Sequence, residues 1–126
     1  MVRKICLDTD ILIQMMRDDD NLNAIMTSLD ADFFTTSINV FEIWQGHREG
    51  EETLELLSPL VKVDFDEKSA LISGDIQRKL LDKGDVLGVR DVFVASVCIK
   101  NELELLTFNF KHFERLKKFG LKLVKV

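Results

Sequence analysis

The sequence has 126 residues, of which 46% are hydrophobic and 31% are charged, a balance typical of a globular domain long enough to form a core. No apolar run approaches the roughly 20 residues that a membrane span needs, and Asp8 and Asp10 interrupt the first apolar stretch too early for a signal peptide. We therefore expect residues 1–126 to form a single domain in the cytoplasm, without a membrane partner.

The first predicted elements are a strand over residues 5–7 and a helix that follows it at once. The short apolar run of residues 5–7 is typical of a buried strand, and the apolar side chains of residues 11–16 recur at helical spacing. Asp8 then lies at the carboxyl end of the strand, the side of a parallel sheet on which ligands bind. The alternative is that Asp8 or Thr9 only caps the helix.

Strand and helix patterns alternate along the rest of the chain. We predict strands over residues 33–36, 60–65, 103–107 and 121–126, and helices over residues 22–29, 38–48, 51–57, 67–81 and 109–119. Such alternation favours a three-layer α/β/α domain with a short, mainly parallel sheet. Residues 90–99 stay ambiguous, because their β-branched content favours a strand while their length allows a helix buried on most sides.

Glu42 stands out because it lies among large apolar neighbours in its predicted helix. A carboxylate is costly to bury there unless it is paired or coordinates a metal ion. The alternative is a glutamate on the polar edge of the helix that pairs with a lysine or arginine elsewhere.

Four polar side chains are predicted to converge at one edge of the sheet. Asp8 and Asn109 each follow a strand, and Asp91 opens a helix if residues 90–99 are helical. Together with Glu42, the acids would repel one another, and a divalent cation removes that penalty. Oxygen ligands indicate Mg²⁺ or Mn²⁺.

The net charge of −5 is distributed unevenly. Six lysine and arginine side chains against one glutamate give residues 111–126 a charge of +5, which leaves −10 for the rest. This asymmetry fits a phosphate-binding surface beside an acidic site, and it fits equally a solvated face. The phosphate-binding candidates are Lys111, Arg115, Lys117 and Lys118.

At this point the sequence resembles a known family, the PIN-domain ribonucleases, and within it the VapC-type toxins of toxin–antitoxin pairs. The resemblance covers the whole chain and is carried by the order and spacing of segments 7–10 (Leu-Asp-Thr-Asp), 41–46 (Phe-Glu-Ile-Trp-Gln-Gly), 84–87 (Gly-Asp-Val-Leu), 91–95 (Asp-Val-Phe-Val-Ala) and 106–109 (Leu-Thr-Phe-Asn).

The resemblance implies a helix that begins near Asp91 and hydrolysis of RNA phosphodiesters by a metal-activated water. It makes Asp8, Glu42 and Asp91 the ligands of Mg²⁺ or Mn²⁺, with Asn109 as a fourth catalytic position. It also implies a homodimer and a cognate VapB-like antitoxin that occupies or blocks the site.

Departures from the family pattern concern the residues around these acids. Asn109 stands where some members carry a fourth acid, so a second ion would be held more weakly. Asp10 replaces a more usual neutral residue and could partly restore that charge. Thr9 and Thr107 carry hydroxyls that could orient a carboxylate or water, or could serve as caps.

Two other functions compete with this interpretation. The segment from Asp8 to Asp10 resembles the Asp-x-Asp opening of haloacid-dehalogenase-type phosphatases, in which Asp8 would be the nucleophile and Asp10 the general acid. That pattern wants Thr or Val where this chain has Leu12. The other alternative is a non-catalytic module that binds RNA or protein, for which three mutually repelling acids would serve no purpose.

Overall fold

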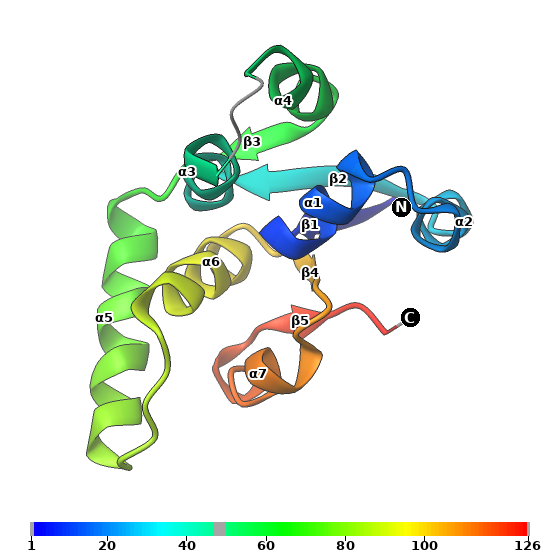
Figure 1. The fold of residues 1–126 in the computed structure, drawn as a ribbon. Helices are drawn as coiled ribbons and strands as arrows, with labels where there is room; N and C mark the ends of the chain where they lie inside the picture. The colour runs from blue at the N-terminus through cyan, green and yellow to red at the C-terminus, as the bar shows by residue number, and fades with distance from the viewer. Residues whose placement is uncertain (1, 47–49, 126) are drawn as a thin grey trace.

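The strands of the sheet run parallel to one another in the order β3-β2-β1-β4-β5, with the first strand at the centre (Figure 1). The computed structural model describes residues 2–46 and 50–125. Its strands are β1 (Arg3–Leu7), β2 (Ala31–Thr36), β3 (Val61–Val63), β4 (Glu104–Leu106) and β5 (Lys122–Leu123). Its helices are α1 (Thr9–Met16), α2 (Asp20–Ser28), α3 (Ser37–Gly46), α4 (Gly50–Leu57), α5 (Glu67–Asp82), α6 (Val89–Lys100) and α7 (Phe110–Glu114), with a 3-10 turn η1 (Lys117–Phe119).

Two hydrophobic clusters cover the opposite faces of the sheet and make the domain three-layered. Successive side chains of a strand point to opposite faces, so Cys6 joins the cluster that contains α5 and α6, while Ile5 and Leu7 join the cluster that contains α1. All three residues are fully buried. This explains why β1 is a continuous apolar run rather than an alternating one. The predicted α/β/α fold is therefore confirmed.

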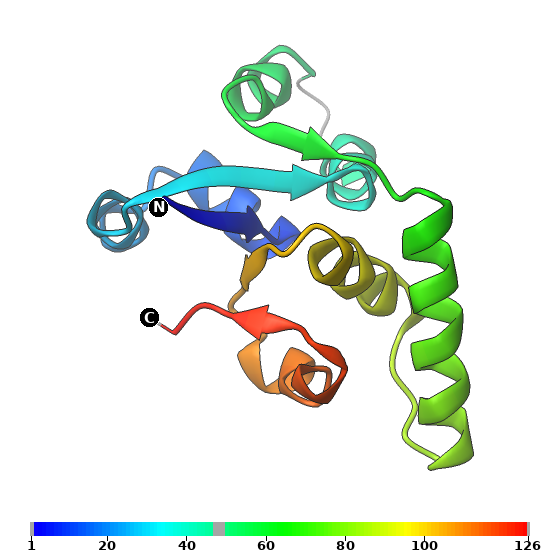
Figure 2. The same ribbon diagram turned by 180° about the vertical axis from the view of Figure 1, so that it is seen from behind.

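The ambiguous run of residues 90–99 lies within α6. Helix α6 packs along α5, as the two opposite views show (Figure 1, Figure 2). Val92 and residues 94–98 are buried on most sides of this helix. The strand alternative is therefore wrong. The sequence pattern was ambiguous because near-complete burial removes the polar face that would have revealed a helical period.

The two strands at the edges of the sheet are shorter than predicted. The strand expected over residues 60–65 is only Val61–Val63, and the one expected over residues 121–126 is only Lys122–Leu123. These are the two edge strands, and short edge strands limit unwanted pairing with other chains. The helix predicted over residues 109–119 is also wrong in its length, since α7 ends at Glu114 and η1 follows.

The remaining boundaries agree with the sequence to within a few residues. The end predicted for the third helix, Arg48, lies outside the described residues. Gly120 ends η1 with a φ of 105°, a left-handed conformation that favours glycine. In the described part of the chain, no helix combines the length and hydrophobicity that a membrane crossing requires.

Because the strands are parallel, their carboxyl ends meet at one edge of the sheet. Asp8 follows β1 directly, α3 follows β2 directly, and Thr107 follows β4 directly. The start of α6 reaches the same edge, where Arg90 bonds to Asp8. The fold thereby brings together segments that are far apart in the sequence.

Candidate active site

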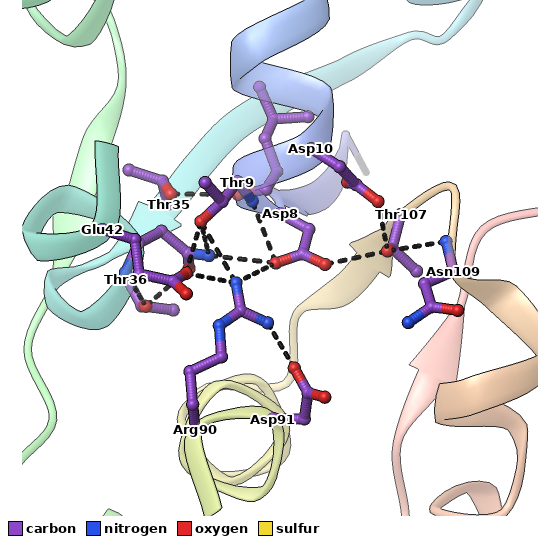
Figure 3. A network of polar contacts seen from close by, with 12 residues as sticks. Asp8, Thr9, Asp10, Thr35, Thr36, Glu42, Arg90, Asp91, Thr107 and Asn109 are labelled. Carbon is purple, nitrogen blue, oxygen red and sulfur yellow. Dashed lines mark hydrogen bonds and ion pairs between the residues drawn. The ribbon is translucent and has the colours of Figure 1, made fainter. Parts of the chain in front are cut away.

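Asp8 is the buried centre of the polar cluster at the carboxyl edge of the sheet (Figure 3). Its Oδ1 accepts hydrogen bonds from the Thr9 backbone N–H at 2.9 Å and from the Asn39 side-chain amide at 3.0 Å. Its Oδ2 accepts one from the Thr107 hydroxyl at 2.8 Å. Asp8 therefore caps α1, as the alternative interpretation held, and also faces the cluster, because the remaining bonds come from other elements.

Glu42 and Asp91 approach the same point from two different helices. Glu42 lies on α3, and its Oε1 accepts a hydrogen bond from the Thr9 hydroxyl at 2.6 Å. Asp91 lies in the first turn of α6, where the helix dipole favours a negative charge. Its Oδ2 lies 2.6 Å from His112 Nε2. The structure thus brings the three predicted acids to one place.

A residue that the sequence analysis missed, Arg90, lies between the three acids (Figure 3). Its Nη2 bonds to Asp8 Oδ1 at 2.8 Å and to Glu42 Oε1, and its Nη1 bonds to Asp91 Oδ1. Burial lowers the pKa of Arg90, but the hydrogen bonds to the carboxylates and the charge of Asp8 outweigh it and leave that pKa above its ordinary value. Glu42 therefore pairs with an arginine, as its alternative interpretation held.

Asn39 is a second residue that the sequence analysis missed. It is fully buried in the first turn of α3, and its amide nitrogen donates to Asp8 Oδ1 and to the Thr9 hydroxyl at 2.9 Å. Its carbonyl oxygen accepts from the Thr36 hydroxyl at 2.6 Å, which fixes the amide orientation. Asn39 lies three residues before Glu42, hence on the same helix face. This three-residue spacing from Glu42 was the one feature of the sequence that could have identified Asn39 as a site residue.

Asp10 and Asn109 lie beside the three acids rather than among them. Asp10 Oδ2 accepts from the Phe108 backbone N–H at 3.1 Å and from the Thr107 hydroxyl at 3.3 Å. Burial and the charge of Asp8 raise the pKa of Asp10. Asn109 is exposed and donates its backbone N–H to Thr107 at 3.1 Å. Within residues 2–46 and 50–125, no hydrogen bond joins its side chain to the three acids.

The basic candidates lie on α7, on η1 and in the short connection between them. His112 of α7 contacts Asp91 and so ties this segment to the site. Lys111, Lys117 and Lys118 are exposed, whereas Arg115 pairs with Asp85 at 2.6 Å. The segment that carries the exposed lysines is thus joined to the acidic cluster through the contact between His112 and Asp91.

The donor set of the cluster fits a hard divalent cation in its chemistry. The three carboxylates offer oxygen atoms, the ligands that Mg²⁺ and Mn²⁺ prefer. In their present positions, however, no three His, Cys, Asp or Glu side chains of the described residues could hold a metal ion together. They surround a guanidinium group instead.

The fold and the site together define a parallel α/β domain with an acidic cluster at the carboxyl edge of its central strands. The model of the PIN domain family matches residues 5–119. This chain therefore belongs to the PIN domain family. The family assignment leaves the phosphatase alternative without support.

Proteins similar to this chain include two ribonucleases from Methanocaldococcus jannaschii. Ribonuclease VapC3 is 33% identical over 91 residues, which cover 72% of this chain and 94% of the relative. Ribonuclease VapC1 is 29% identical over 123 residues, which cover 95% of this chain and 86% of the relative. In the crystal structure of VapBC2 from Rickettsia felis bound to a promoter DNA fragment, one chain aligns with a TM-score of 0.83 and 25% identity, covering 96% of this chain and 97% of that one.

We expect Asn39→Ala to lower the free energy of unfolding by about 1–3 kcal/mol, because Asp8 and Thr36, which are both buried, each lose one hydrogen-bond partner. Urea unfolding measures this difference. The matched control is Asn23→Ala, which removes an exposed amide that bonds to Asp18 and should change stability by less than about 0.5 kcal/mol. Equal losses in both variants would contradict a structural role for Asn39.

Proposed function

We propose that this protein is a metal-dependent endoribonuclease of the VapC type that hydrolyses RNA phosphodiesters in the cytoplasm. The observation that carries the proposal is the meeting of Asp8, Glu42 and Asp91 around one cationic group at the carboxyl edge of the sheet. The two similar archaeal proteins named as ribonucleases support the substrate class.

Asp8, Glu42 and Asp91 would hold Mg²⁺ or Mn²⁺, and Asn109 would contribute its amide oxygen beside them. A divalent ion in this position supplies activation of a water molecule and stabilisation of charge on a phosphoryl oxygen. The exposed position of Asn109 suits contact with water or substrate better than direct ligation, which agrees with a weaker second site.

The surrounding side chains hold the acids in orientation. Asn39 and Thr107 bond to different oxygens of Asp8, so this carboxylate cannot rotate without losing one of them. Thr9 joins Glu42 to the start of α1. Asp10 acts one step further out, because it holds the Thr107 hydroxyl and the backbone of Phe108. Such outer contacts fix the geometry of metal-binding carboxylates.

RNA would approach across α7 and η1. Lys111, Arg115, Lys117 and Lys118 lie on this segment, which also reaches Asp91 through His112. Cationic side chains beside an acidic cleavage site would hold the phosphates that flank the cleaved bond.

We also propose that the protein forms a homodimer and is neutralised by a VapB-like antitoxin. The similarity to VapBC2 supports the partner. A mainly apolar groove of about 350 Å³ adjoins Glu42 and is lined by Ile13, Met16, Arg17, Ile43, Gly46 and Glu52. A partner segment in this groove would end at the acidic site and could block it.

We expect Asp8→Asn and Asp91→Asn each to reduce Mg²⁺- or Mn²⁺-dependent RNA cleavage at least about a hundredfold, because each removes a charged metal ligand. Cleavage of labelled RNA by the purified variants measures this loss, and circular dichroism confirms folding. Asp32→Asn makes the same chemical change on an exposed side chain near the amino end of β2 and should keep full activity. Undiminished cleavage by Asp8→Asn would remove the nuclease proposal.

A double variant, Lys117→Gln with Lys118→Gln, should weaken RNA binding and reduce its dependence on salt. The slope of log K against log salt should fall by about 1.4, at roughly 0.7 for each phosphate contact. Binding of single-stranded RNA to the Asp8→Asn background avoids cleavage during the titration. The charge-matched control, Lys68→Gln with Lys83→Gln, alters exposed lysines at the ends of α5. An identical slope in both double variants would assign the basic segment to a solvated face.

The antitoxin proposal predicts that Ile13→Glu prevents neutralisation by the cognate VapB-like protein while RNA cleavage continues. Ile13 lines the apolar groove and is 40% exposed, so the charge opposes docking without entering the core. Co-purification measures binding of the antitoxin, and light scattering measures whether the protein is a dimer. Val61→Glu, on edge strand β3, is the control. If the Ile13→Glu variant is still neutralised, the antitoxin binds a surface other than this groove.

A further inference from the structure

The guanidinium group of Arg90 bonds to one oxygen of each acid of the cluster (Figure 3). These atoms are Asp8 Oδ1, Glu42 Oε1 and Asp91 Oδ1. The same Nη2 also donates to the Thr9 hydroxyl at 3.1 Å. One planar cation thus spans carboxylates from three separate elements.

These are oxygens that a divalent ion at the cluster would need. A divalent metal ion and a guanidinium group both carry positive charge. They would repel each other if both lay within bonding distance of the same carboxylate oxygens. The two positive groups therefore exclude each other from the centre of the cluster. Electrostatic balance makes this exchange possible, because either cation offsets part of the repulsion between the acids.

We propose that Arg90 is an internal counter-cation that competes with the divalent ion, so that metal binding requires the guanidinium group to leave the three acids. The inference rests on the proposed metal-dependent function. It makes Arg90 a residue that lowers the apparent affinity of the three acids for the metal ion.

Three features of Arg90 favour displacement of its guanidinium group. Its side chain is 30% exposed, so a route to solvent exists. Its Nε is buried and has no hydrogen-bond partner among the described residues, so the present position satisfies the group incompletely. Arg90 lies in the first turn of α6, and a rotation of its long side chain would free the acids without moving the helix.

The consequence is a reduced apparent affinity for metal. When a ligand binds only the fraction of molecules with a free site, its apparent dissociation constant rises by the inverse of that fraction. If Arg90 occupies the acids in about nine molecules of ten, metal binding weakens about tenfold. Replacing the Arg90 side chain should reverse this tenfold loss of metal affinity.

The experiment is Mn²⁺ titration by calorimetry of the wild-type protein, Arg90→Gln, Arg90→Lys, Arg3→Gln and Asp8→Asn. We expect Arg90→Gln to bind Mn²⁺ about tenfold more tightly than wild type. Arg90→Lys keeps the charge but loses the planar fork that reaches three carboxylates, so its affinity should fall between the two. Repulsion through space alone would instead leave Arg90→Lys at the wild-type value.

Arg3→Gln is the matched control. Arg3 also donates two hydrogen bonds to one carboxylate, from its Nε to Glu104 Oε2 at 2.9 Å and from its Nη2 to Glu104 Oε1 at 2.7 Å. This pair lies near the amino ends of β1 and β4. Its removal changes the net charge by the same amount and should leave Mn²⁺ affinity unchanged. Asp8→Asn tests the metal site itself and should lose the binding.

A second measurement needs no variant. In the wild-type protein without metal, the NMR signals of the Arg90 guanidinium nitrogens should be those of an immobilised side chain. As Mg²⁺ is added, they should change to those of a mobile side chain. Persistent restrained signals at saturating Mg²⁺, or an Arg90→Gln affinity equal to wild type, would overturn the inference and leave the nuclease proposal standing. A wild-type protein that binds neither ion would overturn both.

Discussion

Three carboxylates can stay ionised together in one partly buried site only if a positive charge offsets their mutual repulsion. Asp8, Glu42 and Asp91 meet this condition through a single guanidinium group, that of Arg90. Removing this cation without a replacement would force at least one acid to take up a proton or turn toward solvent. The organisation of the carboxyl edge of the sheet depends on that balance of charge.

The fold supplies the acids, and hydrogen bonds fix their directions. The parallel sheet delivers Asp8 from β1 and Thr107 from β4 to the same edge, and α3 starts there because β2 ends there. Asn39 then links α3 to the start of α1 through one buried bond to Asp8 and one partly buried bond to Thr9. The site is therefore rigid on the side of β1 and more open toward α6 and α7, where Arg90 and His112 are partly exposed.

The sequence allowed the acids to be predicted, but not the groups that hold them. Asp8 and Asp91 could be placed because a short apolar strand and a family-like spacing mark their positions. Arg90 could not, because the direction of a long side chain depends on contacts across 82 residues of chain. The contact of His112 with Asp91 was missed as well, because no motif around His112 marks it. The short edge strands were overestimated because a two-residue hydrophobic period continues past the point where hydrogen bonding ends.

The most direct test of the metal-binding account is anomalous scattering from crystals grown with Mn²⁺. The account predicts one strong peak about 2.1 Å from oxygens of Asp8, Glu42 and Asp91, with Arg90 turned away from them. A saturating Mn²⁺ concentration that leaves no peak there, with the guanidinium group still between the acids, would contradict it.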